Sequence, residues 1–142
     1  MINELTAEHR HCDDLFAELE AAMDKENFEK AQSLFAEYER QMLEHFDVEE
    51  QKLFPAFEAR TGMTSGPTMV MRMEHSQIRG LLSEMKDAIF HGQPEIFFNL
   101  SETLLIMTQQ HNMKEENVLY PMCELHLGAD FLNDEKNAVL SN

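Results

Sequence analysis

The chain has 142 residues, 43% of them hydrophobic, with five glycines, four prolines and no tryptophan, and its formal net charge at pH 7 is −16. This length fits one domain with a core of its own, and the composition favours helices. The acidic charge argues against nucleic acid and anionic membranes as partners, because both require a basic surface.

Targeting and redox signals are weak along the whole sequence. No run approaches the ~18 apolar residues that a membrane-spanning helix needs. The N-terminus lacks the basic and apolar regions of a signal peptide. Cys12 and Cys123 are too few for a disulfide framework and are expected to fill apolar space. We therefore expect a cytoplasmic protein that binds neither membrane nor nucleic acid.

The first half of the chain predicts two helices. Over residues 4–25 the apolar residues recur at helical spacing, and at ~100° per residue His9 faces the apolar stripe while His11 faces away. The second helix is expected over residues 28–60. Pro55 should kink or break this helix, because proline lacks a backbone donor and clashes with the preceding turn.

The second half mirrors the first. A glycine-containing loop at residues 61–67 separates the halves, and helices are expected over residues 68–91 and 95–125. A further short helix is expected around residues 131–139. Four antiparallel helices with short connections predict an all-α, up-down-up-down four-helix bundle. We expect residues 1–142 to form a single domain whose half-repeats cover about residues 5–60 and 68–126.

The two halves repeat at an offset of 66 residues, and the repeat falls on residue types that bind metals. Four of the seven histidines pair at this offset. The repeated residues are His9 with His75, His45 with His111, and Glu49 with Glu115. A single inward histidine is more often a hydrogen-bonded core residue than a ligand, but the shared offset favours a dinuclear metal site.

Each half carries one His-x-x-x-Glu-Glu segment, beginning at His45 or at His111. Residues four apart lie on one helical face, roughly 6 Å apart along the axis, so both side chains can reach an interior metal pair. A carboxylate on an apolar stripe is costly unless it is paired or coordinated. Glu49 and Glu115 are therefore expected to bind metal, whereas the glutamate after each should face solvent or a neighbouring helix.

Other metal-binding patterns fit less well. His11 is an alternative to His9 in the site. Ferritin-like bundles need two Glu-x-x-His segments, and this chain has one, from Glu8 to His11. The common zinc motifs are absent.

The doubled His-x-x-x-Glu-Glu with a trailing aromatic-proline pair resembles the hemerythrin-like, or HHE cation-binding, domain. The matching segments are Glu8-His9-Arg10 with Leu15–Glu20, His45–Pro55 and His111–Pro121. The resemblance covers roughly residues 2–127. It implies a four-helix bundle holding two iron ions in a non-haem, oxo- or hydroxo-bridged diiron centre. His9, His45, His75 and His111 would be terminal ligands, and Glu49 and Glu115 would bridge.

The chain departs from the oxygen-carrying members of that family. They carry a second histidine four residues after the one matching His75, where this chain has Arg79, and an Asp where it has Glu115. One iron would then lack a protein ligand. Asp13, the repeat partner of Arg79, is expected either to form an ion pair with Arg79 across the bundle or to turn inward as a seventh ligand.

These features favour a protein that binds or senses O2, NO or the cellular iron or redox state over a dedicated enzyme. The expected small-molecule partner is O2, NO or peroxide. The alternatives are a diiron enzyme with peroxidase-like or NO-reducing activity, an iron-centre repair protein, and a metal-free bundle that acts through protein contacts. Repair proteins typically carry an extra cysteine-bearing N-terminal region, which weakens that assignment for this chain.

Overall fold

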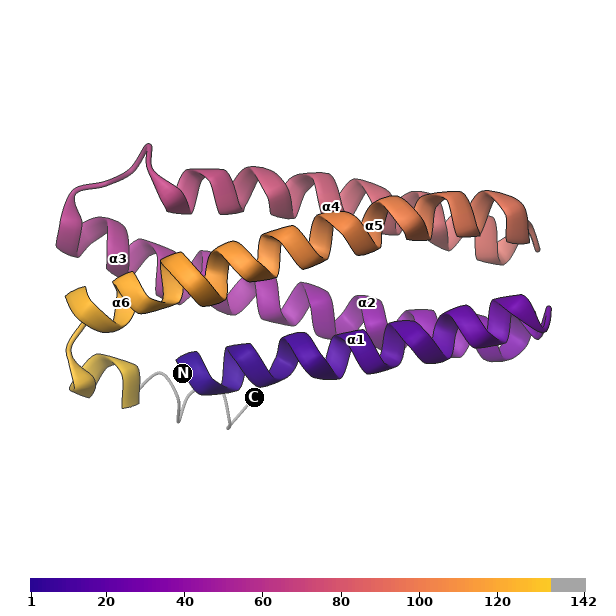
Figure 1. Ribbon diagram of the computed structural model, residues 1–142, viewed down its shortest axis with the longest axis horizontal. Helices are drawn as coiled ribbons and strands as arrows, with labels where there is room; N and C mark the ends of the chain where they lie inside the picture. Colours follow the sequence, from indigo (N-terminus) through magenta and orange to yellow (C-terminus); the bar gives the residue numbers. More distant parts are fainter. Residues whose placement is uncertain (134–142) are drawn as a thin grey trace.

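Long helical rods lying side by side form the part of the chain that the structure, a computed structural model, describes, residues 1–133 (Figure 1). The first rod is α1, Ile2–Asp24, and the third is α4, Pro67–Phe90. The second rod runs through α2, Phe28–Val48, then η1, Glu49–Leu53, and α3, Phe54–Thr61. The fourth runs through α5, Pro94–Lys114, then η2, Glu115–Leu119, and α6, Tyr120–His126.

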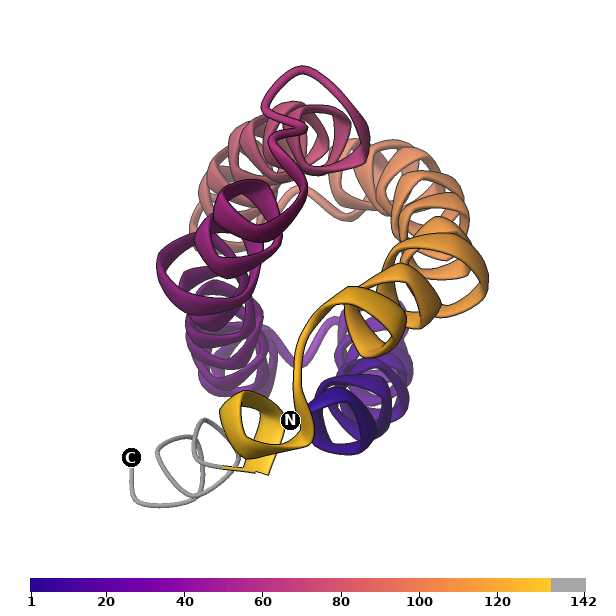
Figure 2. The same ribbon diagram turned by 90° about the vertical axis from the view of Figure 1, so that its left-hand side faces the viewer.

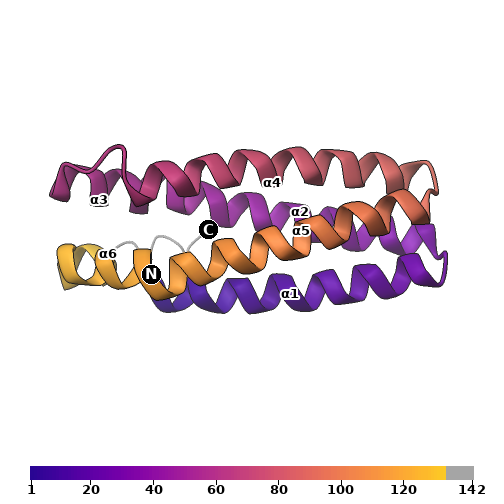
Figure 3. The same cartoon turned by 45° about the horizontal axis from the view of Figure 1, so that its top comes forward.

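The rods run alternately up and down, so that short connections join neighbours (Figure 3). Seen end-on, they occupy four corners in the order α1, α2, α4, α5, which places α1 diagonally opposite α4 (Figure 2). No strand occurs in residues 1–133. The all-α four-helix bundle predicted from the sequence is confirmed.

Only part of the expected C-terminal helix lies within the described residues. Residues 129–133 are helical, whereas the rest of the expected segment lies outside the described residues. None of the described helices combines the length and apolarity that crossing a membrane would require.

The ends of the helices follow from local chemistry. The Asn27 side chain accepts a hydrogen bond from the backbone N–H of Lys30 and caps the start of α2. Pro67 and Pro94 begin α4 and α5, where a missing N–H costs nothing. Gly62 ends α3 with a φ of 74°, a left-handed conformation that glycine adopts without strain.

The second and fourth rods stay helical through Pro55 and Pro121, respectively, instead of breaking. The five residues before Phe54 and the five before Tyr120 form π-helical turns, η1 and η2. In each, the N–H of the aromatic residue donates to the carbonyl five residues earlier, that of Glu49 or Glu115. The wider turn accommodates the proline ring, which in a regular α-helix clashes with the carbonyl four residues earlier.

Two apolar clusters fill the bundle and leave a polar layer between them. The first apolar cluster lies toward the α1–α2 and α4–α5 connections and includes Phe16, Leu19, Phe35, Leu82 and Phe97. The second lies toward the other end and includes Leu5, Leu53, Phe54, Phe57 and Tyr120. On α1, His9 comes between Leu5 of the second cluster and Cys12 of the first. The histidines therefore stand in the middle of the core.

Candidate metal centre

All six residues predicted to bind metal are buried and face one another between the two apolar clusters. The most exposed of them, His9, is only 6% exposed. They come from every rod: His9 from α1, His45 and Glu49 from α2 and η1, His75 from α4, and His111 and Glu115 from α5 and η2. His11, the alternative to His9, is exposed.

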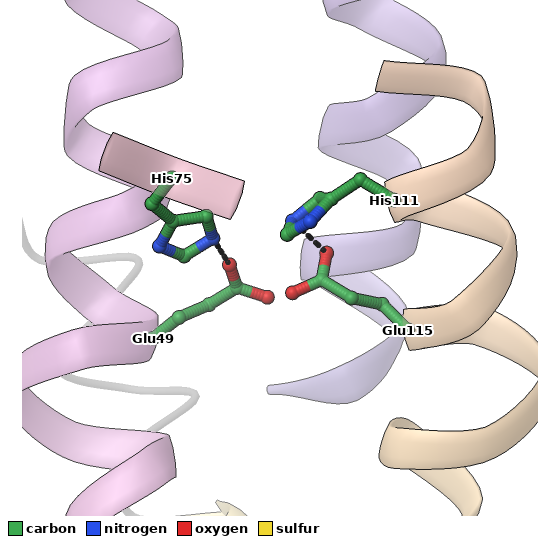
Figure 4. Close-up of side chains that lie close together, drawn as sticks. All are labelled: Glu49, His75, His111 and Glu115. Atoms are coloured by element: carbon green, nitrogen blue, oxygen red, sulfur yellow. Dashed lines mark ion pairs between the residues drawn. The ribbon is translucent and has the colours of Figure 1, made fainter. Parts of the chain in front are cut away.

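The six side chains form two adjoining groups that share Glu115. One group is Glu49, His75, His111 and Glu115, and the other is His9, His45 and Glu115. Within each group, one potential ligand atom per residue lies within 4.8 Å of all the others. Figure 4 shows the Glu49 and Glu115 carboxylates meeting between the helices, with an imidazole beside each. Two adjoining groups with a shared carboxylate match the donor arrangement of a dinuclear site.

The Nε2 atoms of the four histidines point toward these carboxylates. His75 Nε2 lies 3.1 Å from Glu49 Oε1, and His111 Nε2 lies 3.4 Å from Glu115 Oε1. On the other side, His9 Nε2 lies 3.1 Å from Glu115 Oε1 and 3.1 Å from His45 Nε2.

Several of these buried atoms have no hydrogen-bond partner among the described residues. They are Glu49 Oε1, Glu115 Oε2, His75 Nε2 and His111 Nε2. Although His75 Nε2 and Glu49 Oε1 are close, they are not aligned for a hydrogen bond. An unsatisfied buried polar atom is costly, and here the unsatisfied atoms are imidazole nitrogens and carboxylate oxygens that converge on one point. This donor set fits a metal.

The outer ring nitrogen of each histidine meets a different glutamate. His9 Nδ1 lies 2.8 Å from Glu116, His45 Nδ1 2.8 Å from Glu8, His75 Nδ1 2.5 Å from Glu50, and His111 Nδ1 2.8 Å from Glu74. An ionised carboxylate can only accept, so each Nδ1 carries a hydrogen, and Nε2 is the nitrogen that faces the interior, where a metal would bind.

The sequence analysis did not identify these four outer carboxylates as part of the site. The signal was present, because Glu8 and Glu74, like Glu50 and Glu116, are repeat partners at the offset of 66. Glu50 and Glu116 do face neighbouring helices, which was one of the two positions expected for them.

Two cations contact the outer carboxylates that hold His75 and His111. The Arg79 guanidinium donates to both oxygens of Glu50, at 3.1 and 3.2 Å, and lies 5.4 Å from the centre of the Phe46 ring. Lys114 Nζ donates to Glu74 Oε2 at 2.5 Å. Burial would raise the pKa of Glu50 and of Glu74, but Arg79 and His75 on the first and Lys114 and His111 on the second bring both below the usual value.

The prediction that Arg79 forms an ion pair with Asp13 is wrong. Arg79 lies on α4, at the corner diagonally opposite α1, and Glu50 on the adjacent rod is nearer. Asp13 is exposed and is not part of either potential metal-binding group. Although Asp13 is exposed, partial burial of its carboxyl group and the nearby Asp14 and Glu116 carboxylates raise its pKa, and His9 opposes them.

Tyr120 is a buried residue of the site that the sequence analysis did not identify. Its hydroxyl donates to Glu49 Oε2 at 2.6 Å and lies 3.3 Å from Glu115 Oε1. Its repeat partner Phe54 stacks on His75 at a centroid distance of 5.7 Å, as the Tyr120 ring stacks on His9 at 5.9 Å, but Phe54 has no hydroxyl. One side of the site therefore carries a phenol, and the other carries an apolar ring.

The site's buried charges perturb its pKa values. Burial would raise the pKa of Glu115, but the close contacts with Glu49 and with the His111, His45 and His9 imidazoles hold it well below the usual range. Burial would lower the pKa of His45 and of His111, but the facing glutamates raise both. A metal ion that bound here would therefore displace protons from imidazole.

A small cavity borders the His9 and His45 side of the site. Its volume is about 10 Å³, and its lining includes Cys12, Tyr38, Phe46 and Thr108. Burial raises the pKa of Cys12 to about 11, and that of the more distant Cys123 to about 12, so both thiols stay neutral at pH 7. Both cysteines belong to the apolar clusters, as expected from the sequence.

Comparison with known proteins supplies one match. The family described as the hemerythrin HHE cation binding domain matches residues 1–123, a stretch that contains all six candidate ligands. No curated protein and no solved structure matches the chain.

Proposed function

The chain belongs to the hemerythrin HHE cation-binding family, and from that premise we propose that it holds a non-haem diiron centre through which it binds or senses O2, NO or the cellular iron or redox state. The observation that carries this proposal is the pair of adjoining histidine–glutamate groups sharing Glu115 in a dry core, with ligand-type atoms that lack hydrogen-bond partners.

The donor set supports iron. Imidazole and carboxylate together suit iron, whereas structural zinc sites are closed tetrahedra that often include thiolates. His9 and His45 would hold one ion, His75 and His111 the other, and Glu49 and Glu115 would lie between them. When bound, two iron ions would supply reversible oxidation and coordination positions for a small ligand.

The protein's own residues prepare the site for that role. The four outer glutamates fix the orientation and tautomer of the histidines, because each accepts the Nδ1 hydrogen. Tyr120 holds Glu49 by donating to its Oε2. The apolar clusters above and below exclude water, which strengthens electrostatic interactions inside the site.

The size of the adjacent cavity supports a ligand of two or three atoms. About 10 Å³ is close to the smallest space that holds one water molecule. This cavity is too small for an organic substrate, whereas O2, NO or peroxide would need only small side-chain movements to enter it. This supports the binding or sensing of small molecules over an enzyme with a larger substrate.

The test is anaerobic loading with ferrous iron, followed by metal analysis and then by exposure to O2 and to NO with absorption spectra recorded. We expect two iron ions per chain and spectral changes with at least one of the two gases. A Glu49→Ala/Glu115→Ala double variant is the control and should retain little iron. A protein that binds at most one iron per chain and stays colourless would overturn the proposal. Sustained turnover of peroxide or NO would identify the enzyme alternative instead.

A further inference from the structure

The two halves of the site differ in charge despite their repeat relation. We propose that Arg79 and Lys114 make the two metal positions unequal, so that a divalent cation binds first and more tightly between His9 and His45 than between His75 and His111. This inference rests on the proposed two-metal function and concerns the order and strength of filling.

At the position between His75 and His111, both outer carboxylates are paired with a cation. Glu50, which holds His75, accepts two hydrogen bonds from Arg79, and Glu74, which holds His111, accepts one from Lys114. The outer layer of this half therefore has two negative charges and two positive charges in direct contact.

At the position between His9 and His45, neither outer carboxylate is paired with a lysine or arginine of the described residues. Among residues 1–133, no lysine or arginine forms an ion pair with Glu116, which holds His9, or with Glu8, which holds His45. The repeat partners of the two cations are Asp13, in place of Arg79, and Val48, in place of Lys114. Asp13 and Arg10 border a surface cavity together with His9 and Glu116, so their charges offset each other there, and Arg10 forms no ion pair with Glu116 among the described residues.

Two physical effects follow, and both favour the first half. An uncompensated carboxylate attracts a divalent cation, while a nearby guanidinium or ammonium repels it. A carboxylate that accepts an imidazole N–H also makes the opposite nitrogen a stronger donor. A cation on that carboxylate draws its electron density away and weakens this effect.

The aromatic residues differ in the same direction. The rings of Phe46 and Phe54 stack on His75, with centroid distances of 3.8 and 5.7 Å. Against His9 lies Tyr120, whose hydroxyl is 3.5 Å from His9 Nε2. Charge is costlier to place among apolar rings than beside a polar group. The second metal position is therefore the less favourable one on this count as well.

The experiment is an anaerobic ferrous-iron titration followed by calorimetry and by NMR of the imidazole signals. For the unaltered protein we expect two binding steps that differ about tenfold or more in affinity, the range over which partners of ligating histidines act. The signals of His9 and His45 should change during the first equivalent, and those of His75 and His111 during the second.

Two exposed substitutions test the cause. Lys114→Gln removes one repelling charge, and we expect it to tighten the second step about fivefold to tenfold, as a unit charge roughly 10 Å from a divalent ion would. Asp13→Arg places a cation at the repeat position of Arg79 and should weaken the first step by a similar factor. Lys86→Gln is the matched control, because Lys86 is exposed on α4 and pairs with Glu39 away from the site.

The outcomes separate this inference from the proposed function. Two iron ions that bind with equal affinity, or a first equivalent that changes His75 and His111, would overturn the inference and leave the diiron proposal intact. The inference would also be overturned if Lys86→Gln changed the affinity of the second binding step as strongly as Lys114→Gln does. Binding of at most one iron per chain would instead overturn the diiron proposal itself.

Discussion

Neighbouring glutamates in this site have different contacts and should have different functions. Glu115 faces three histidine Nε2 atoms and belongs to both candidate metal-binding groups, whereas Glu116 contacts the outer nitrogen of His9. The same division holds for Glu49 and Glu50 in the other half.

We predict that Glu115→Ala abolishes the binding of both iron ions, because it removes the shared carboxylate. Glu116→Ala should keep two iron ions per chain but weaken their binding roughly 10–100-fold, the usual effect of losing the partner of a ligating histidine. Iron content after desalting and ferrous titration of both variants measure this. If Glu116→Ala lost all iron while Glu115→Ala retained it, the assignment of bridging and outer carboxylates would be reversed.

Tyr120 provides a second prediction at a single position. Tyr120→Phe should lower the free energy of unfolding of the metal-free protein by about 1–3 kcal/mol, because Glu49 Oε2 loses its donor in a buried place. Phenylalanine is compatible with the equivalent repeat position, since Phe54 occupies it. In the iron-loaded protein the loss should be smaller, because metal would satisfy Glu49. Urea denaturation of both forms compares the two, and an equal loss in both would contradict this role for Tyr120.

At the level of helices, the sequence predicts the rods but not the π-helical turns. The helix limits follow from apolar periodicity and from Asn27, Gly62, Pro67 and Pro94, which act locally. The π turns leave only a subtle mark. After buried Glu49, the next buried residues are the adjacent pair Leu53 and Phe54, and periodicity alone does not separate this spacing from that of a regular α-helix.

The candidate site likewise contains residues that the sequence predicts and contacts that it does not. The six inward residues could be predicted because each depends only on its own helix and on the repeat. The outer contacts could not, because Glu8 meets His45 and Arg79 meets Glu50 only once it is known which helices are adjacent. The expected pairing of Arg79 with Asp13 failed for this reason, since α1 and α4 occupy opposite corners.

The π-helical turn in η1 should let the second rod pass through Pro55 without a break. Deleting Gln51, which is exposed, would remove the residue that the wider turn absorbs and place Pro55 in a regular α-helix, where its ring clashes with the carbonyl four residues earlier. Such a proline costs about 3 kcal/mol or more, so we predict a clearly lower melting temperature in circular dichroism. Gln51→Ala keeps the residue count and is the control, with an expected change within about 0.5 kcal/mol. A deletion variant as stable as this control would show that the turn is not structurally required.

For the molecule as a whole, the position of the candidate site should couple metal binding to folding. Four imidazoles and two carboxylates occupy the layer between the two apolar clusters, so each rod contributes polar groups to the centre of the core. Without metal, several of these atoms lack partners, which is unfavourable in a dry interior. The apolar clusters at the two ends contain no such groups, so they should hold the helices together when the central layer is destabilised.

We therefore predict that removal of iron lowers the melting temperature and loosens the centre of the bundle before its ends. A ligand that binds only the folded state, at a free concentration of about 100 times its Kd, adds about 2.7 kcal/mol to the free energy of unfolding. Chelation should remove that contribution. Hydrogen exchange locates the effect. Amides near His45–Glu49 and His111–Glu115 should exchange faster after chelation, whereas those near Leu19 and Phe97, within the first apolar cluster, should change less. The same concentration of chelator, saturated with calcium beforehand, serves as the control for effects of the chelator itself. Identical melting curves with and without iron would contradict a metal site in the core, because a metal bound there cannot leave the stability of the surrounding helices unchanged.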